Sequence, residues 1–219
     1  MSTTTSGYDV TEGVIRDVAL RHFARIGYEG ATMRAIAADV GIRASSLYNH
    51  FSSKQDLLWD LAVTALDALE AGWAATQGSL AQGSNPADQL VAFVASHVRF
   101  HATHSTQAAL VNGNLQGLTA ERYQHVVSRR DAYAEELIAI LARGQRERSL
   151  GVPDTQLAAY AILQMGMGVA IWYRADGPRS VDELCAGYAA LALKIVSTHG
   201  PSGRGTHATA ARGERGKEA

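Results

Sequence analysis

The spacing of apolar residues is the feature that most constrains this chain, because between residues 8 and 199 it follows the α-helical period almost throughout. No alternating run typical of a half-buried strand occurs there, and no convincing hairpin signal. The first helix is predicted from about Val10 to Ile26, with Gly27 where a helix-ending glycine belongs. Its apolar stripe consists of Val14, Ile15, Val18, Ala19, Phe23 and Ile26. The sequence therefore predicts an all-α fold.

Capping residues divide the chain into nine predicted helices. Thr32 caps a short helix that Gly41 stops, and a third helix follows from about Ala44 to Phe51. Ser52 and Gln55 predict a capping box for the next helix, which runs to about Gln77. The later helices begin at Asn85 with Pro86, near Thr106, at Thr119, at Asp154, and at Ser180 with Glu183.

Composition identifies the ends of the folded part and its compartment. Residues 1–7 and 200–219 are rich in small and polar residues, so we predict that both are disordered. The N-terminus has no basic segment followed by an apolar one, which favours a cytoplasmic protein.

Residues 155–173 carry no charge, but glutamines and glycines interrupt them, which favours a buried helix over a membrane span. Cys185 is predicted to be a buried thiol.

The segment "GIRASSLYNHFSSK", residues 41–54, has few residues suited to a core. Leu47 and Phe51 are its obvious apolar anchors, so its other side chains are predicted to face an outside partner. The chain has 20 basic and 21 acidic residues, and residues 1–54 are nearly balanced as well. Any contact with a nucleic acid must therefore come from local placement of side chains.

The segment from Val18 to Leu58 resembles the DNA-binding domain of the TetR family of bacterial transcriptional regulators. The string "ALRHFARIGYEGATMRAIAADVGIRASSLYNHFSSKQDLL" carries the resemblance, in the Thr-Met pair, the turn glycine, the Leu-Tyr-x-His-Phe block and the final lysine. The resemblance implies a helix-turn-helix DNA-binding domain over residues 8–54. It implies a larger all-helical ligand-binding and dimerisation domain over residues 55–199.

The resemblance also implies which residues contact DNA. The helix after Gly41 is expected to enter the major groove, where base contacts specify sequence and phosphate contacts position the domain. The expected base readers are Arg43, Ala44, Ser46 and Asn49. The other expected DNA contacts are Thr32, Arg34, Ser45, Tyr48, His50 and Lys54. Arg43 stands where a small capping hydroxyl is common, so either Ser45 shifts the helix start or Arg43 replaces capping with a DNA contact.

The string "ILQMGMGVAIWYRADGPRSVDELCAGYAALAL", residues 162–193, resembles the acyl-CoA-responsive branch of the same family, which controls fatty-acid or sterol breakdown. This resemblance implies an apolar pocket for the acyl part, with arginines that receive phosphates. The implied ligand-binding residues are Phe100, Asn112, Tyr123, Arg129, Arg130, Met165, Trp172 and Arg174. The remaining arginines of the helix after Thr119 are expected to pair with acidic residues of that same helix.

These observations predict a homodimeric repressor that leaves a palindromic operator when a small hydrophobic effector, such as an acyl-CoA, binds. The last two apolar helices are expected to pair with their copies, with Gly166 and Gly168 permitting close approach. A drug-sensing regulator, a metal-binding protein and an architectural DNA-binding protein remain alternatives. His97, His101 and His104 have ligand-like spacing, but polar lining of a cavity or of an interface is the preferred interpretation. No catalytic or cofactor motif is present, so no enzyme, cofactor or metal site is predicted.

Overall fold

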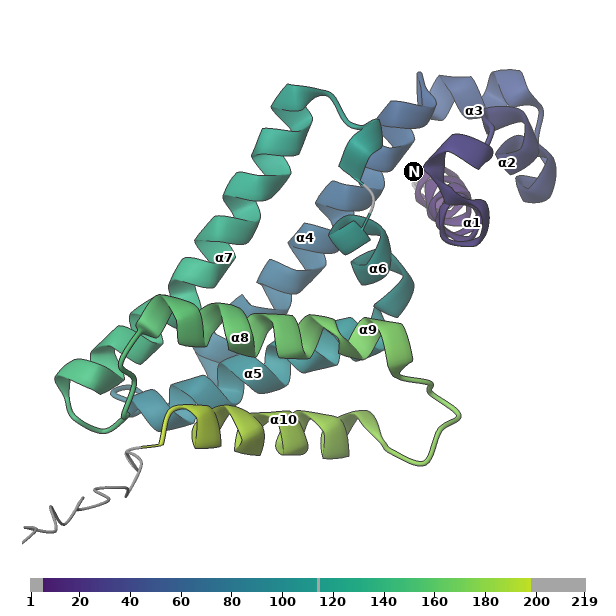
Figure 1. Cartoon of the computed structure of the whole chain (residues 1–219). Helices are drawn as coiled ribbons and strands as arrows, with labels where there is room; N and C mark the ends of the chain where they lie inside the picture. The colour runs from purple at the N-terminus through teal and green to yellow at the C-terminus, as the bar shows by residue number, and fades with distance from the viewer. Residues whose placement is uncertain (1–5, 114, 198–219) are drawn as a thin grey trace, which may run out of the picture.

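The computed structural model describes residues 6–113 and 115–197, and these fold into α-helices and one short 3-10 helix, without a strand in those two ranges (Figure 1). This confirms the predicted all-α class. The helices are α1 (Ser6–Gly30), α2 (Met33–Val40), α3 (Ala44–His50), α4 (Lys54–Ser79), α5 (Pro86–Thr103), α6 (Ser105–Gly113), η1 (Leu115–Gly117), α7 (Ala120–Arg146), α8 (Thr155–Met167), α9 (Val169–Trp172) and α10 (Val181–Ile195).

The two termini lie mostly outside this description. α1 begins at Ser6, inside the stretch 1–7 for which disorder is predicted. The rest of that stretch, and the predicted tail 200–219, lie outside the described residues. Gly27 adopts φ 75° within α1, which breaks the helix near the end that the sequence predicts.

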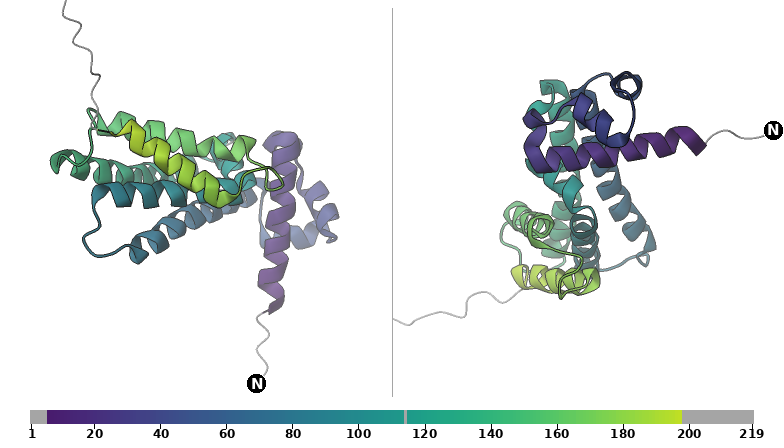
Figure 2. Two further views of the ribbon diagram at one scale, coloured as in Figure 1. Left: turned by 90° about the horizontal axis from the view of Figure 1, so that it is seen from below. Right: turned by 90° about the vertical axis from the view of Figure 1, so that its right-hand side faces the viewer.

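The helices form two hydrophobic cores that share α4. One core packs α1, α2 and α3 against the first turns of α4, through Leu57, Leu58 and Leu61. The other packs α5 to α10 against the rest of α4, from Ala62 to Trp73. Figure 2 shows the α1–α3 unit at one end of the larger bundle, with the N-terminal part of α1 projecting from it.

Side-chain caps start the helices where the sequence predicts, with one exception. Thr32, Asn85, Thr119 and Asp154 each accept a hydrogen bond from the backbone of the first helical turn that follows. Ser180 and Glu183 form the predicted capping box. The exception is α4, where the predicted pair of Ser52 and Gln55 is wrong. Ser53 is the extended residue before the helix, and its hydroxyl accepts from the Asp56 backbone N–H at 3.0 Å.

The uncharged segment 155–173 is two helices rather than the single predicted one. α8 ends at Met167 and α9 begins at Val169, with a break at Gly168, so the described residues hold ten α-helices instead of nine. A glycine inside a helix lowers its stability, which favours a break there. In the described ranges, no helix has the length and apolar character needed to cross a membrane.

α10 lies along α5, which places Cys185 inside the larger core. Its Sγ–H donates to the Ala95 carbonyl at 3.2 Å, and burial raises the pKa of this thiol. Cys185 is a free, buried cysteine, as the sequence predicts. Arg99 of α5 reaches Asp182 of α10 at 2.6 Å across the exposed edge of the same contact.

Gly166 has a different role from the predicted one. A Cβ at this position would lie 2.4 Å from Cδ2 of His97, so the missing side chain lets α8 approach α5 within one subunit. Gly166 is buried, and close approach to a partner helix is not what it permits. At Gly168 a Cβ would meet only backbone atoms of its own helix, the nearest at 3.4 Å.

The contact between Gly166 and His97 predicts the effect of adding one methyl group. Gly166→Ala should lower the free energy of unfolding by about 1 to 3 kcal/mol, because an overpacked core must shift its neighbours. Gly78→Ala is the matched control, since nothing lies within 4 Å of a Cβ built there. Urea unfolding at one fixed protein concentration measures both variants. Equal stability of the two would contradict the assigned contact.

Candidate functional site

The α2–α3 pair presents an exposed helix on a well-packed base. Gly41 takes φ 82° between the two helices, a conformation that suits glycine, and the Ile42 N–H donates to the Ala37 carbonyl at 3.0 Å. Leu47 is fully buried and Phe51 is 7% exposed, which confirms them as the inward anchors of the segment 41–54.

The outer face of α3 holds most of the residues predicted to contact DNA. Arg43, Ser45, Tyr48 and Asn49 are exposed, and Ala44, Ser46 and His50 are half-buried. Arg43 occupies the N-cap position, and its side chain makes no capping hydrogen bond. Because α3 begins at Ala44, the alternative in which Ser45 shifts the helix start is wrong.

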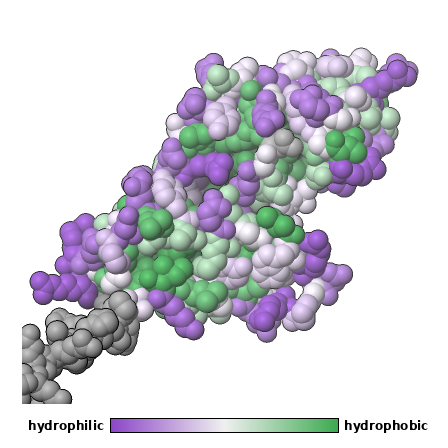
Figure 3. All heavy atoms as spheres, viewed as in Figure 1, coloured by the Kyte–Doolittle hydropathy of each residue, from purple (hydrophilic) through white to green (hydrophobic). Residues whose placement is uncertain are grey.

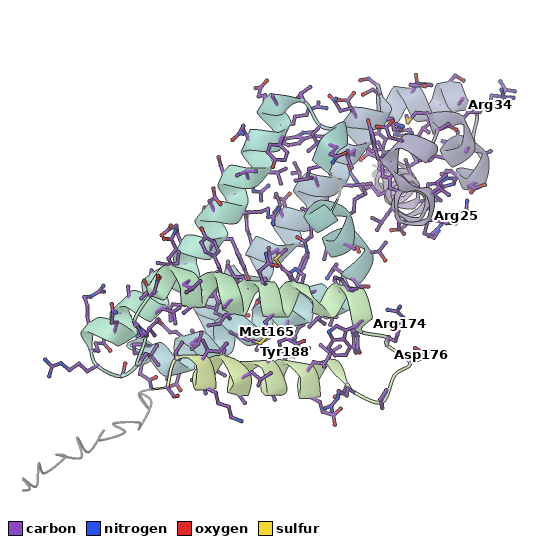
Figure 4. All side chains as sticks on the ribbon, in the orientation of Figure 1. Arg25, Arg34, Met165, Arg174, Asp176 and Tyr188 are labelled. Carbon is purple, nitrogen blue, oxygen red and sulfur yellow. The ribbon has the colours of Figure 1, made fainter. Side chains whose placement is uncertain are left out.

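Thr32 and Arg34 lie at the start of α2. The Thr32 hydroxyl oxygen accepts from the Ala35 N–H at 3.2 Å, so this side chain caps α2 and can still donate its own hydroxyl hydrogen. Arg34 is exposed and points away from the α1–α3 unit at its outer edge (Figure 4). It is therefore free to reach a partner.

Lys54 lies in a different place from the one that the resemblance implies. Its ammonium donates to the carbonyls of Tyr28 at 2.7 Å and Ala31 at 3.1 Å, and it sits 4.2 Å from the centre of the Tyr28 ring. Tyr28 belongs to the last turn of α1, after Gly27, and Ala31 directly follows the helix. Lys54 thus ties the start of α4 to the end of α1.

A second contact between α1 and α4 was not predicted from the sequence. The Arg16 guanidinium donates to Asp60 at 2.7 Å and to Glu12 at 3.0 Å, and His50 Nδ1 of α3 lies 3.9 Å from Glu12. The hydrogen bonds to Asp60 raise the pKa of Arg16. Arg16 and Asp60 are 44 residues apart, so no local pattern could have indicated the pair.

The larger domain, which consists of α5 to α10 and the rest of α4, also contacts the α1–α3 unit. The contact is made by the segment from α6 to the start of α7. Leu110 of α6 belongs to the core of the smaller unit. Gln55 donates to the Gly117 carbonyl at 3.0 Å, and Arg122 donates to Asp56 at 2.6 Å. Hydrogen bonds from Ser52, Ser53 and Arg122 lower the pKa of Asp56 to about 2, so the pair stays charged at neutral pH.

The larger domain contains a cavity of about 300 Å³ among α4, α5, α6, α7 and α8. Its apolar walls consist of Ala65, Leu69, Phe100, Ala108, Val111, Val127, Ala134, Leu163 and Met167. Its polar residues are His97, His101, Asn112, Arg130, Asp131, Tyr133, Tyr160 and Gln164. A concave apolar space with a few polar groups is typical of a small-molecule site.

Three of the predicted ligand-binding residues line this cavity, namely Phe100, Asn112 and Arg130. Arg129 does not, because Glu70 and Asp67 of α4 each bind its guanidinium at 2.7 Å. Met165 lies between α8 and α10, beside Tyr188 (Figure 4). Arg129 and Arg130 are adjacent in the sequence, but only Arg130 faces the cavity, while Arg129 faces the acidic residues of α4.

The other three predicted residues also lie off the cavity wall. Tyr123 and Trp172 are 43% and 49% exposed. Arg174 follows α9, and its guanidinium donates to the Tyr173 carbonyl at 3.0 Å (Figure 4). The Trp-Tyr-Arg block of the sequence is therefore outside the cavity.

Two arginines of α7 pair with acidic residues of α4; for Arg122 this replaces the predicted partner on its own helix, and Arg129 was predicted to bind the ligand. Arg122 pairs with Asp56, and Arg129 with Asp67 and Glu70. Of the expected pairs within the helix, Arg143 with Glu147 is present at 3.4 Å. In the described part of the chain, Arg130 has no acidic partner within ion-pair distance.

Two of the three histidines with ligand-like spacing, His97 and His101, line the cavity, and His104 does not. His97 and His101 are 4% and 3% exposed, and burial holds the pKa of His97 well below its usual range. His104 stacks on Phe100 and meets the Thr103 hydroxyl at 2.9 Å. Within residues 6–113 and 115–197, no group of three potential ligands is arranged to hold a metal ion. The interpretation as cavity lining therefore agrees with the positions of His97 and His101.

The outer faces of α8, α9 and α10 form an apolar surface (Figure 3). Leu157 is 68% exposed and Ile171 is 76% exposed, which is unusual for large aliphatic side chains. The surface also includes Tyr160, Trp172, Leu191 and Ile195.

Comparison with known proteins matches both domains. The family model described as "Tetracyclin repressor-like, C-terminal domain" matches residues 83–196, and that of "Bacterial regulatory proteins, tetR family" matches residues 15–61. The HTH-type transcriptional repressor KstR2 of Rhodococcus jostii RHA1 is 28% identical over 199 residues, which are 89% of this chain and 96% of that protein.

Solved structures share the fold over most of the chain. The ketosteroid transcriptional regulator KstR2 of Mycobacterium tuberculosis superposes with a TM-score of 0.76 at 26% identity, over 85% of this chain and 95% of that one. AibR, in complex with isovaleryl coenzyme A and operator DNA, superposes with a TM-score of 0.74 at 21% identity, over 84% and 98%. The latter likeness concerns the fold alone.

The position of Lys54 predicts a loss of stability when its ammonium is removed. Lys54→Ala should lower the free energy of unfolding by about 1.5 to 3 kcal/mol, because two carbonyls lose a charged donor. Arg34→Ala removes an equal charge from an exposed position of the same unit and should change it by less than about 0.5 kcal/mol. Urea unfolding compares the two variants, and a Lys54→Ala protein as stable as Arg34→Ala would refute the structural role.

Proposed function

Because the chain belongs to the TetR family of bacterial regulatory proteins, we propose that it is a homodimeric transcriptional repressor which releases its operator when a small effector fills the cavity. One observation carries the proposal. α6 contributes Val111 and Asn112 to the cavity wall and Leu110 to the core beneath the helix-turn-helix unit. A ligand in the cavity therefore contacts the element that supports the exposed helix α3.

We assign the reading of DNA to the outer face of α3. Asn49 is exposed there, and an amide can bind adenine through two hydrogen bonds. Arg43, Ala44 and Ser46 lie toward the start of the same helix, where recognition helices contact base edges. Arg34 supplies a free guanidinium for phosphate. The remaining backbone contacts are Thr32, Ser45, Tyr48 and His50. Lys54 supports this face through α1 instead of contacting phosphate itself.

We assign dimerisation to the apolar surface of α8, α9 and α10. Leu157, Ile171 and Leu191 are too exposed and too apolar to favour contact with water over a second copy. A two-fold pairing of α8 and α10 with their copies buries this surface and leaves both α3 helices available. Two recognition helices related by two-fold symmetry suit a palindromic operator.

The effector that the cavity suits best is an acyl thioester with a compact acyl part. The apolar walls accommodate the acyl group, and Arg130 offers a guanidinium whose charge no acidic side chain in the described ranges neutralises. One structural relative supports a thioester, since AibR binds isovaleryl coenzyme A, and another, the ketosteroid regulator KstR2, supports an apolar effector. Binding of such a ligand to one conformation of the dimer lowers operator affinity by its differential affinity for the two states.

The DNA assignment predicts two separable effects. Asn49→Ala should reduce the difference in affinity between operator and unrelated DNA, because a base contact is lost. Arg34→Ala should weaken binding to all sequences and reduce the slope of log affinity against log salt by about one. Arg146→Ala removes the same charge at the far end of α7 and serves as the control. Fluorescence polarisation at several salt concentrations measures all three. If neither Asn49→Ala nor Arg34→Ala differs from Arg146→Ala, the assigned DNA face is wrong.

The effector assignment predicts different roles for Arg130 and Arg174, although the sequence resemblance implies that both bind the ligand. Arg130→Ala should weaken effector binding by about 1.5 to 3 kcal/mol, the usual worth of a hydrogen bond to a charged group. Arg174→Ala should bind the effector normally, because Arg174 lies outside the cavity. The measurement is operator release by a panel of acyl-CoAs, the corresponding free acids, and free CoA. Release by no thioester, or equal potency of acid and thioester, would exclude the acyl-CoA effector and leave the regulator assignment in place.

A further inference from the structure

Two buried histidines in the cavity wall have fixed tautomers. His97 Nε2 lies 3.1 Å from the Leu163 carbonyl, and His101 Nδ1 lies 2.9 Å from the His97 carbonyl. A carbonyl oxygen can only accept a hydrogen bond, so each of these nitrogens carries the proton and donates it. In a neutral imidazole the second nitrogen is then an acceptor. The two acceptor nitrogens are therefore Nδ1 of His97, which is buried beneath the cavity surface, and Nε2 of His101, which belongs to a residue of the cavity wall.

The surroundings keep both rings neutral. Burial lowers the pKa of His97, as does the neighbouring His101, whose ring centre is 4.3 Å away. Burial also lowers the pKa of His101, and Arg130 of α7 adds to the effect. The other titratable groups of the cavity are Asp131 and Tyr133 of α7 and Tyr160 of α8. Burial raises the pKa of Tyr133, so its hydroxyl is also neutral.

Several of these polar atoms have no partner within the described ranges. His97 Nδ1 and the Tyr133 hydroxyl are buried and make no hydrogen bond there, and Nε2 of His101 in the cavity wall has no hydrogen-bond partner there either. An unsatisfied buried polar atom costs free energy, which a ligand with the right complementary group recovers. The missing complement of an acceptor nitrogen is a hydroxyl or N–H donor.

We propose that the cavity selects an effector whose apolar body carries a hydroxyl group, which donates to Nε2 of His101 while Arg130 binds a carbonyl or anionic oxygen of the same molecule. The chemical class is a hydroxylated acyl thioester or acid. The inference rests on the proposed function, because it places the effector in this cavity. It adds that the polar atoms of α5 discriminate among effectors of the same length.

The test compares hexanoyl-CoA with its 3-hydroxy and 6-hydroxy derivatives, which place the hydroxyl at opposite ends of the acyl chain. Calorimetry measures binding, and fluorescence polarisation measures operator release. At least one hydroxylated ligand should bind about three- to tenfold more tightly than hexanoyl-CoA, the usual net worth of a neutral hydrogen bond. His101→Phe should abolish this preference. His125→Phe makes the same change on the exposed face of α7 and should retain it.

A second measurement does not depend on a stable variant. The ¹⁵N chemical shift of the unprotonated nitrogen of His101 in the wild-type protein should change with the hydroxylated ligand and not with hexanoyl-CoA. Equal binding of all three ligands, or no binding by any, overturns the inference. Equal binding accompanied by operator release overturns it and leaves the proposed function intact. A hydroxyl preference in binding without operator release supports the inference and refutes the proposed function.

Discussion

The continuity of α4 through two hydrophobic cores is the constraint on which the rest of the structure depends. Its first turns pack with α1, α2 and α3, and its remaining turns form a wall of the cavity-bearing domain. Its 26 residues span roughly 40 Å at 1.5 Å per residue, without a described break. Neither core can move as a unit without moving the other or bending α4. The arginine contacts of Arg16 and Arg122 to Asp60 and Asp56 hold this helix from both sides near its start.

α6 provides the second connection, and it is the one that a ligand touches. Gly117, just after it, packs so closely on the Tyr28 ring that a Cβ there would lie 2.4 Å from the ring. Tyr28 in turn receives Lys54 on its ring face and on its carbonyl. α6 therefore reaches the cavity wall with Asn112 and the core of the α1–α3 unit with Leu110, while Gly117 contacts Tyr28 near the end of α1. These contacts carry an effect only if the ligand binds two arrangements of them unequally.

The features that depend on residues close together in the chain are the ones that the sequence predicts well. Apolar spacing and caps such as Thr32 and Asp154 act within one helical turn, so the helices and the outward face of α3 follow from neighbouring residues. The cavity depends on residues far apart in the chain. Arg129 is removed from it by Glu70, 59 residues away, and His97 is oriented by Leu163, 66 residues away. Neither relation leaves a periodic signal in the sequence. The position of the Trp-Tyr-Arg block outside the cavity could not be predicted from local spacing either.

The cavity combines one unneutralised cation with neutral acceptors, and the combination constrains its ligand more than either feature alone. If His97 or His101 were protonated, the buried wall would hold a second positive charge near Arg130, and low polarity would make this repulsion costly. The neutral rings avoid that cost, but they leave the lone pair of His101 Nε2 in the cavity wall without a donor in the described residues. A purely apolar ligand would cover this lone pair without satisfying it, and a simple anion would satisfy Arg130 alone. A molecule that brings both a donor and an acceptor on an apolar body satisfies the whole wall, so the cavity can discriminate by chemistry as well as by size.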